Sequence, residues 1–169
     1  SDLYDYLVHA LRELGRDDEA RALALAWAAF LEREASRAPS PRARAVFDAH
    51  RLLAYTAMGE PLRAVPLLEQ SEHDFPSDYN PPARLARAYL EAGLHADALA
   101  AIRRALDLAY GPRKLRLWAL EADVYEAKGD KASARRALRD ALDFSATLAL
   151  TGGYPELRAA LQKRFAALL

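Results

Sequence analysis

Few side chains in this sequence are suited to catalysis or to metal binding, and those few are widely separated. The chain has no cysteine, which removes thiolate nucleophiles, thiolate metal ligands and disulfides together. None of its histidines has a partner at the i, i+3 or i, i+4 spacing that places two imidazoles on one helix face. The histidines are His9, His50, His73 and His95. We therefore predict no metal site and no cofactor.

Serine and glycine patterns also give no sign of an active site. The sequence contains neither a Gly-x-Ser-x-Gly elbow nor a Ser-x-x-Lys motif. The pair Gly152–Gly153 lacks the third glycine and the preceding strand of a phosphate-binding loop. The many carboxylates are explained by solvated helix faces. We predict no catalytic residue and no enzymatic activity.

Composition excludes further classes of function. The 24 basic and 24 acidic side chains cancel, so the chain as a whole has no electrostatic attraction for nucleic acid. The longest apolar run, Ala22 to Leu31, is about half of a membrane span, and we predict no membrane segment. The frequent use of Arg and Ala suits a protein encoded by a bacterial genome. Both the bacterial cytoplasm and the periplasm are compatible with the sequence. Because the chain begins Ser1-Asp2 without Met, we expect a piece of a longer protein.

A repeated spacing indicates the elements on which any site must be built. A large residue, a glycine four residues later and an alanine five residues after that recur at intervals of 34 to 44 residues. The four sets are Leu11/Gly15/Ala20, Tyr55/Gly59/Ala64, Tyr89/Gly93/Ala98 and Tyr125/Gly129/Ala134. Glycine permits the left-handed residue that ends a helix, and alanine lets two antiparallel helices approach closely. The pattern predicts an array of helix-turn-helix units.

Apolar periodicity predicts helices and no strands. The expected helices cover 2–14, 17–37, 42–58, 61–74, 81–92, 95–109, 113–128, 131–147 and 155–168. We expect Gly152 and Gly153 to end the array. The following helix has one apolar face formed by Leu157, Leu161, Phe165 and Leu168, which fits a terminal cap.

The unit at 113–147 resembles the tetratricopeptide repeat (TPR) most fully. It carries Trp118, Ala122, Tyr125, Gly129, Ala134, Leu138 and Ala141 at the repeat positions. The resemblance implies an all-α fold, a right-handed superhelix of about four antiparallel helix pairs plus a C-terminal capping helix. We expect one domain over 1–169, with repeats at 1–38, 42–76, 79–110 and 113–147 and a cap at 155–169. The first repeat is the weakest match, and about ten extra residues lie around 32–41.

A second and less specific resemblance is to the C-terminal helical segment of some bacterial thioredoxin-like proteins. It rests on the stretch from Phe75 to Ala86 and on the stretch from Ala109 to Lys114. It would imply a redox domain whose cysteines lie outside this chain.

The TPR resemblance also implies which side chains line a groove, because the first helix of each pair faces it. The groove residues that we single out are Tyr6, His9, His50, Arg84, Arg87, Arg116 and Asp123. Three arginines from adjacent units would hold an acidic segment or a C-terminal carboxylate through charge-assisted hydrogen bonds. The alternative is that these arginines pair with Glu91, Asp123 and Glu126 and leave a neutral surface.

The segment Ala22 to Leu31 is apolar around the whole helix, so both of its sides should be covered. One interpretation is that it packs against the second helix pair. The other is that Trp27, Phe30 and Leu31 contact a missing N-terminal domain or a second copy of the chain.

The sequence therefore predicts a non-catalytic scaffold that binds a protein or peptide in its groove. Two alternatives remain open. One is a structural or oligomerising appendage of a thioredoxin-like redox protein, and the other is an α-domain that binds a small molecule or acts as an enzyme.

Overall fold

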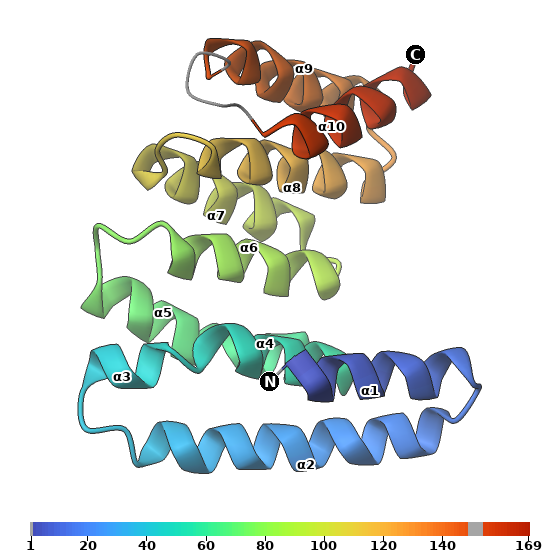
Figure 1. Ribbon diagram of the computed structural model, residues 1–169. Helices are drawn as coiled ribbons and strands as arrows, with labels where there is room; N and C mark the ends of the chain where they lie inside the picture. The colour runs from blue at the N-terminus through green and yellow to red at the C-terminus, as the bar shows by residue number, and fades with distance from the viewer. Residues whose placement is uncertain (1, 149–153) are drawn as a thin grey trace. The chain divides into compact units, whose positions relative to one another are not determined.

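The computed structural model describes residues 2–148 and 154–169, and within them every regular element is a helix. The chain divides into two compact units, residues 1–76 and 77–169, which we describe separately. The first unit contains α1 (Asp2–Glu13), α2 (Asp17–Ser36), α3 (Pro41–Ala45), α4 (Asp48–Ala57), the 3-10 helix η1 (Pro61–Ala64) and α5 (Val65–Asp74). The second contains α6 (Asn80–Glu91), α7 (His95–Leu108), α8 (Arg113–Ala127), α9 (Lys131–Thr147) and α10 (Pro155–Ala167). The predicted all-α helical repeat fold is confirmed (Figure 1).

The four repeated glycines end the first helix of each pair, as predicted. Their φ angles are 69°, 78°, 73° and 79° for Gly15, Gly59, Gly93 and Gly129. In the fourth turn the amide of Asp130 donates to the carbonyl of Tyr125 at 2.8 Å, and the same bond recurs in the other three turns. This bond explains the spacing, because the residue four before the glycine supplies the carbonyl that closes the helix end. The other expected glycine break, Gly152–Gly153, lies outside the described residues.

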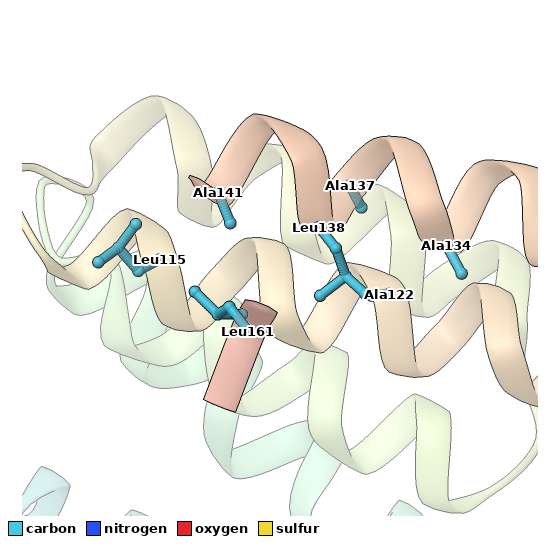
Figure 2. Packing of buried hydrophobic residues seen from close by; sticks show 7 residues of the cluster. All are labelled: Leu115, Ala122, Ala134, Ala137, Leu138, Ala141 and Leu161. Atoms are coloured by element: carbon cyan, nitrogen blue, oxygen red, sulfur yellow. The ribbon is translucent and has the colours of Figure 1, made fainter. Parts of the chain in front are cut away.

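The repeated alanines lie where two helices cross. Ala20, Ala64, Ala98 and Ala134 are all fully buried. Figure 2 shows this packing in the second unit, where the small side chains of α9 face α8 and Leu161 of α10 enters the same cluster. Small side chains at this interface let α8 and α9 approach closely without empty space.

The second helix pair differs from the prediction at two places. The helix expected over 42–58 is divided into α3 and α4, because the amide of Phe47 donates to the carbonyl of Arg44 in a tighter turn. The helix expected over 61–74 begins as η1. Pro66 has no amide hydrogen for the carbonyl of residue 62, so a continuous α-helix cannot run through this point.

The long α2 helix is the centre of the first unit. Its Trp27 is 1% exposed and stacks on Tyr4 of α1, with ring centroids 5.8 Å apart. Leu31 is buried as well, and α2 packs against both α1 and α4. The segment thus contacts α1 of its own pair as well as α4 of the second pair, and this packing buries Trp27 and Leu31. Phe30, by contrast, is 42% exposed.

A buried polar network, which we call the Asp48 network, also holds the first unit together. Asp48 is 1% exposed and accepts a hydrogen bond of 2.6 Å from the Ser71 hydroxyl of α5. Its other oxygen lies 3.9 Å from Arg51 Nη1, and within the described chain Arg51 Nε is buried without a hydrogen-bond partner.

One turn after Arg51 on α4, Tyr55 donates a hydrogen bond of 2.7 Å to Glu32 of α2. Burial, followed by this hydrogen bond, raises the pKa of the Tyr55 hydroxyl. Polar side chains thus tie α4 to both α2 and α5.

Candidate functional site

The candidate site is one surface of the second unit, formed by two neighbouring helices. On α6 and on α8, polar residues three, four or seven positions apart lie on a common side of the helix, and the two helices are in contact. We call this surface the α6–α8 face. It comprises Asn80, Arg84, Arg87 and Glu91 of α6 and Arg113, Arg116, Asp123 and Glu126 of α8.

At the C-terminal end of the α6–α8 face, the arginines are paired with carboxylates of the chain itself. Arg87 lies 3.6 Å from Glu91 and 3.9 Å from Asp123. Arg164 of α10 approaches the same acidic groups, at 2.7 Å from Asp123 and 2.9 Å from Glu126. The structure thus brings the predicted residues Arg87 and Asp123 together, in an ion-pair network rather than as free groups.

Arg164 is the member of this network that sequence reasoning missed. Burial lowers its pKa, but the hydrogen bond to Glu126 and the nearby carboxylates raise it by more, so the guanidinium stays charged. The signal in the sequence was its position three residues after Leu161, which is buried and fixes which side of α10 faces the core.

The N-terminal end of the α6–α8 face is different, because its arginines are not neutralised. Arg84 is half-buried and Arg116 is exposed. Neither makes an ion pair or a hydrogen bond with another side chain in the described parts of the chain. The predicted pairing of the arginines with Glu91, Asp123 and Glu126 therefore applies to Arg87 but not to Arg84 or Arg116.

The other predicted groove residues belong to the first unit. Tyr6 is 68% exposed on α1. His9 is exposed on the same helix, and its Nε2 lies 3.9 Å from Glu13. His50 is half-buried on α4. Within residues 2–148 and 154–169, no three histidine or carboxylate side chains are placed to hold a metal ion. In the same residues, no helix has the length and apolar character needed to cross a membrane.

Two features bear on small-molecule binding or catalysis. A cavity of about 500 Å³ in the second unit is lined by residues that include Leu115, Ser145, Arg158 and Gln162. Separately, burial and the neighbouring Asp140 raise the pKa of Glu121 on α8, while Arg103 opposes the shift. Glu121 does not line this cavity. The perturbed carboxyl and the cavity are thus not combined in one site, as an acid–base active site would require.

Comparison with known proteins gives matches in sequence and in fold. Family models described as tetratricopeptide repeat match residues 55–113 and residues 115–147, which together are more than half of the chain. No curated protein matched.

Two solved structures are similar in fold, and each match covers 99% of this chain and 84% of the chain in the solved structure. Both contain the nearly identical TPR-like repeats of a protein of Podosopora anserina described as a kinesin light chain. One of them, a variant with a single substitution, has 22% identity and a TM-score of 0.64, and the other has 23% identity and a TM-score of 0.63.

The sequence and fold matches agree with the resemblance carried by the Gly-x4-Ala units. They give no support to a link with thioredoxin-like proteins. Repeats of this kind generally mediate contacts between proteins, and the fold is typically a non-catalytic scaffold. The chain belongs to the tetratricopeptide repeat family.

Proposed function

We propose that the chain is a non-catalytic protein-interaction module that binds an acidic segment of a partner protein on the α6–α8 face. The observation that carries the proposal is the contrast between the two ends of this face. At one end Arg87 and Arg164 are satisfied by carboxylates of the chain itself, whereas Arg84 and Arg116 have no such partner in the described residues. Guanidinium groups left without an internal anion favour an anionic ligand, and charge complementarity sets the choice of partner.

A binding experiment with a synthetic peptide tests this proposal. The probe is a fluorescein-labelled peptide in which Glu alternates with Ser, and its control replaces every Glu by Gln. Wild-type protein should bind the Glu peptide at least about tenfold more tightly, because charged hydrogen bonds contribute about 1.5–3 kcal/mol each. Fluorescence anisotropy measures both affinities.

A charge reversal on the face supplies the matched protein variants. Arg84→Glu/Arg116→Glu should abolish the preference for the Glu peptide. Arg21→Glu/Arg42→Glu changes the net charge equally, at two exposed positions of the first unit, and should leave the preference intact. If the double reversal on the α6–α8 face bound the Glu peptide as tightly as wild type, the proposal would be wrong.

Exposed apolar side chains in the first unit favour a second candidate function, self-association. On α1 and in the turn after it, Leu3, Tyr6 and Leu14 are 65%, 68% and 70% exposed, and Phe30 of α2 is also exposed. Exposed apolar groups stabilise a contact when a second copy covers them. Since Trp27 is already buried in its own unit, Phe30 is the residue of the predicted interface that remains available to a second copy.

Light scattering distinguishes the two states. Wild type should have the mass of a dimer, and Leu14→Glu/Phe30→Glu should have that of a monomer, because burying two carboxylates in an apolar contact is unfavourable. Arg21→Glu/Arg42→Glu is the control and should remain dimeric. A wild-type protein that is monomeric at high concentration would exclude this second function.

A further inference from the structure

An arginine that lies over two tyrosine rings is found at the N-terminal end of the α6–α8 face. The guanidinium carbon of Arg113 is 4.4 Å from the ring centroid of Tyr110 and 5.8 Å from that of Tyr79. Tyr110 belongs to the turn before α8, where Gly111 has a φ of 55°. Tyr79, directly before α6, packs on the core cluster that contains Leu117, whereas Tyr110 is 65% exposed.

This arrangement positions Arg113 without using its hydrogen-bonding capacity. Aromatic rings attract the face of a guanidinium group, whereas its N–H groups point outward in the guanidinium plane. Arg113 makes no hydrogen bond or ion pair with a side chain in the described residues. Its N–H groups are therefore left available for a bidentate contact with a carboxylate, and the tyrosines reduce the freedom lost when that contact forms.

Arg113 is also close to Arg116 of the proposed binding site. Arg113 and Arg116 are three residues apart on α8, which corresponds to a separation of about 4.5 Å along the helix axis. The acidic residue nearest in sequence to the start of α6 is Asp78. One of its carboxylate oxygens already accepts hydrogen bonds from the backbone amide and the side-chain amide of Asn80, at 2.9 and 2.7 Å. The cations at this end thus outnumber the local anions.

We infer that Arg113, held by Tyr79 and Tyr110, determines the specificity of the α6–α8 face for acidic residues at alternate positions of an extended partner segment. The inference rests on the proposed function and adds a spacing rule to it. In an extended chain, residues i and i+2 point to the same side, about 6.6–6.8 Å apart, whereas adjacent residues point to opposite sides. Two carboxylates at alternate positions lie on one side of the segment and can therefore reach Arg113 and Arg116 together.

Peptides with different acidic spacing test the rule on the full chain. Each peptide is fluorescein-labelled and blocked at both ends, so that no terminal carboxylate contributes. One contains Glu-Ser-Glu, the second contains Glu-Glu-Ser, and the third contains Gln-Ser-Gln, all in the same Ser/Gly background. Wild type should prefer Glu-Ser-Glu over Glu-Glu-Ser by about tenfold, the effect of one additional charged hydrogen-bonded contact.

Two variants then remove the positioning of Arg113 while leaving Arg84 and Arg116 in place. Arg113→Lys keeps the charge but loses the planar group, and Tyr110→Ala removes the exposed ring. Both should bring the ratio of the two affinities close to one. Arg135→Lys and Tyr154→Ala are the matched controls in the same unit and should keep the wild-type ratio. A ratio of affinities is the readout, because a general loss of folded protein would weaken both peptides equally.

The outcomes separate this inference from the proposed function. If wild type shows no spacing preference, or if Arg113→Lys and Tyr110→Ala both retain it, the inference is overturned. If Arg84→Glu/Arg116→Glu still abolishes binding of the Glu peptides in that case, the proposed function stands alone. If wild type binds Gln-Ser-Gln as tightly as both Glu peptides, both ideas fail.

Discussion

Residues 1–76 and residues 77–169 end the first helix of each pair with the same turn, yet they stabilise the pairs by different means. In the second unit, the alanines of α9 lie against α8, and the ion pairs described above lie on the partly exposed α6–α8 face. In the first unit, the first helix of the second pair is divided into α3 and α4. Asp48 and Ser71 form a hydrogen bond in the interior of this unit. The repeat signature thus specifies the turn and the helix crossing, whereas an irregular repeat depends on polar contacts that the signature does not contain.

The two units also place their partly or fully buried carboxylates in opposite environments. Asp48 accepts a hydrogen bond and lies near Arg51. Glu121 in the second unit is half-buried, and this burial, followed by the charge of Asp140, disfavours its ionised form. Removing the first charge should therefore destabilise the protein, and removing the second should stabilise it.

The largest expected effect is that of Asp48→Ala. The substitution leaves the largely buried Arg51 without its counter-charge and the fully buried Ser71 hydroxyl without its acceptor. Breaking a buried pair of this kind costs about 3–5 kcal/mol of unfolding free energy. Urea denaturation followed by circular dichroism measures the loss. Asp123→Ala is the control in the other unit, and its partly exposed ion pairs should contribute about 1 kcal/mol or less. Equal losses in the two variants would contradict the contrast between the units.

Enlarging the alanines at the helix crossings should have a smaller effect, of similar size in both units. Ala20→Leu in the first unit and Ala134→Leu in the second each force a larger side chain into a fully buried position. Overpacking of this kind costs about 1–3 kcal/mol. Thermal unfolding of both variants, with the exposed Ala26→Leu as control, measures the effect. A much smaller loss for Ala20→Leu would show that the irregular unit does not share the close crossing.

The smallest expected effect is a gain in stability from Glu121→Gln, with a defined pH dependence. The pKa of Glu121 is raised above its ordinary value of 4.5, so its protonated form is favoured in the folded protein. Its contribution to stability is therefore present below pH 4.5 and is lost as the pH rises through the folded-state pKa. Glu121→Gln removes the ionisation that causes this loss of stability. It should therefore raise the unfolding free energy at neutral pH by less than about 1 kcal/mol.

Urea denaturation at several pH values checks the direction of this effect. The advantage of Glu121→Gln over wild type should disappear under acidic conditions. Glu69→Gln, at an exposed position of α5, is the control and should show no such trend. A variant that is less stable than wild type at neutral pH would contradict the assigned environment of Glu121.

Much of the fold was predictable because the controlling interactions are local in sequence. Gly129 and Tyr125 belong to one turn, and their hydrogen-bond pattern depends only on neighbouring residues. The break before α5 was signalled by Pro66 but was not predicted, and the division of α3 from α4 coincides with tertiary contacts of Asp48. In the candidate site, the helical spacing predicted the sides of α6 and α8 on which Arg84, Arg87 and Asp123 lie. It did not reveal that Arg164, 41 residues beyond Asp123, forms ion pairs at one end of the α6–α8 face.

The sequence alone determined the helix pairs, their turns and the small residues at their crossings, because each of these depends on the conformational preference or the size of a residue within one repeat. Which charges remain available depends instead on the packing of the helices. Whether a guanidinium is satisfied depends on groups brought together from distant helices, as Arg87 and Arg164 meet Asp123 while Arg84 and Arg116 do not. The tertiary structure likewise decided that Trp27 is buried in its own unit and that Phe30 is exposed, because burial is a property of packed helices rather than of one apolar segment.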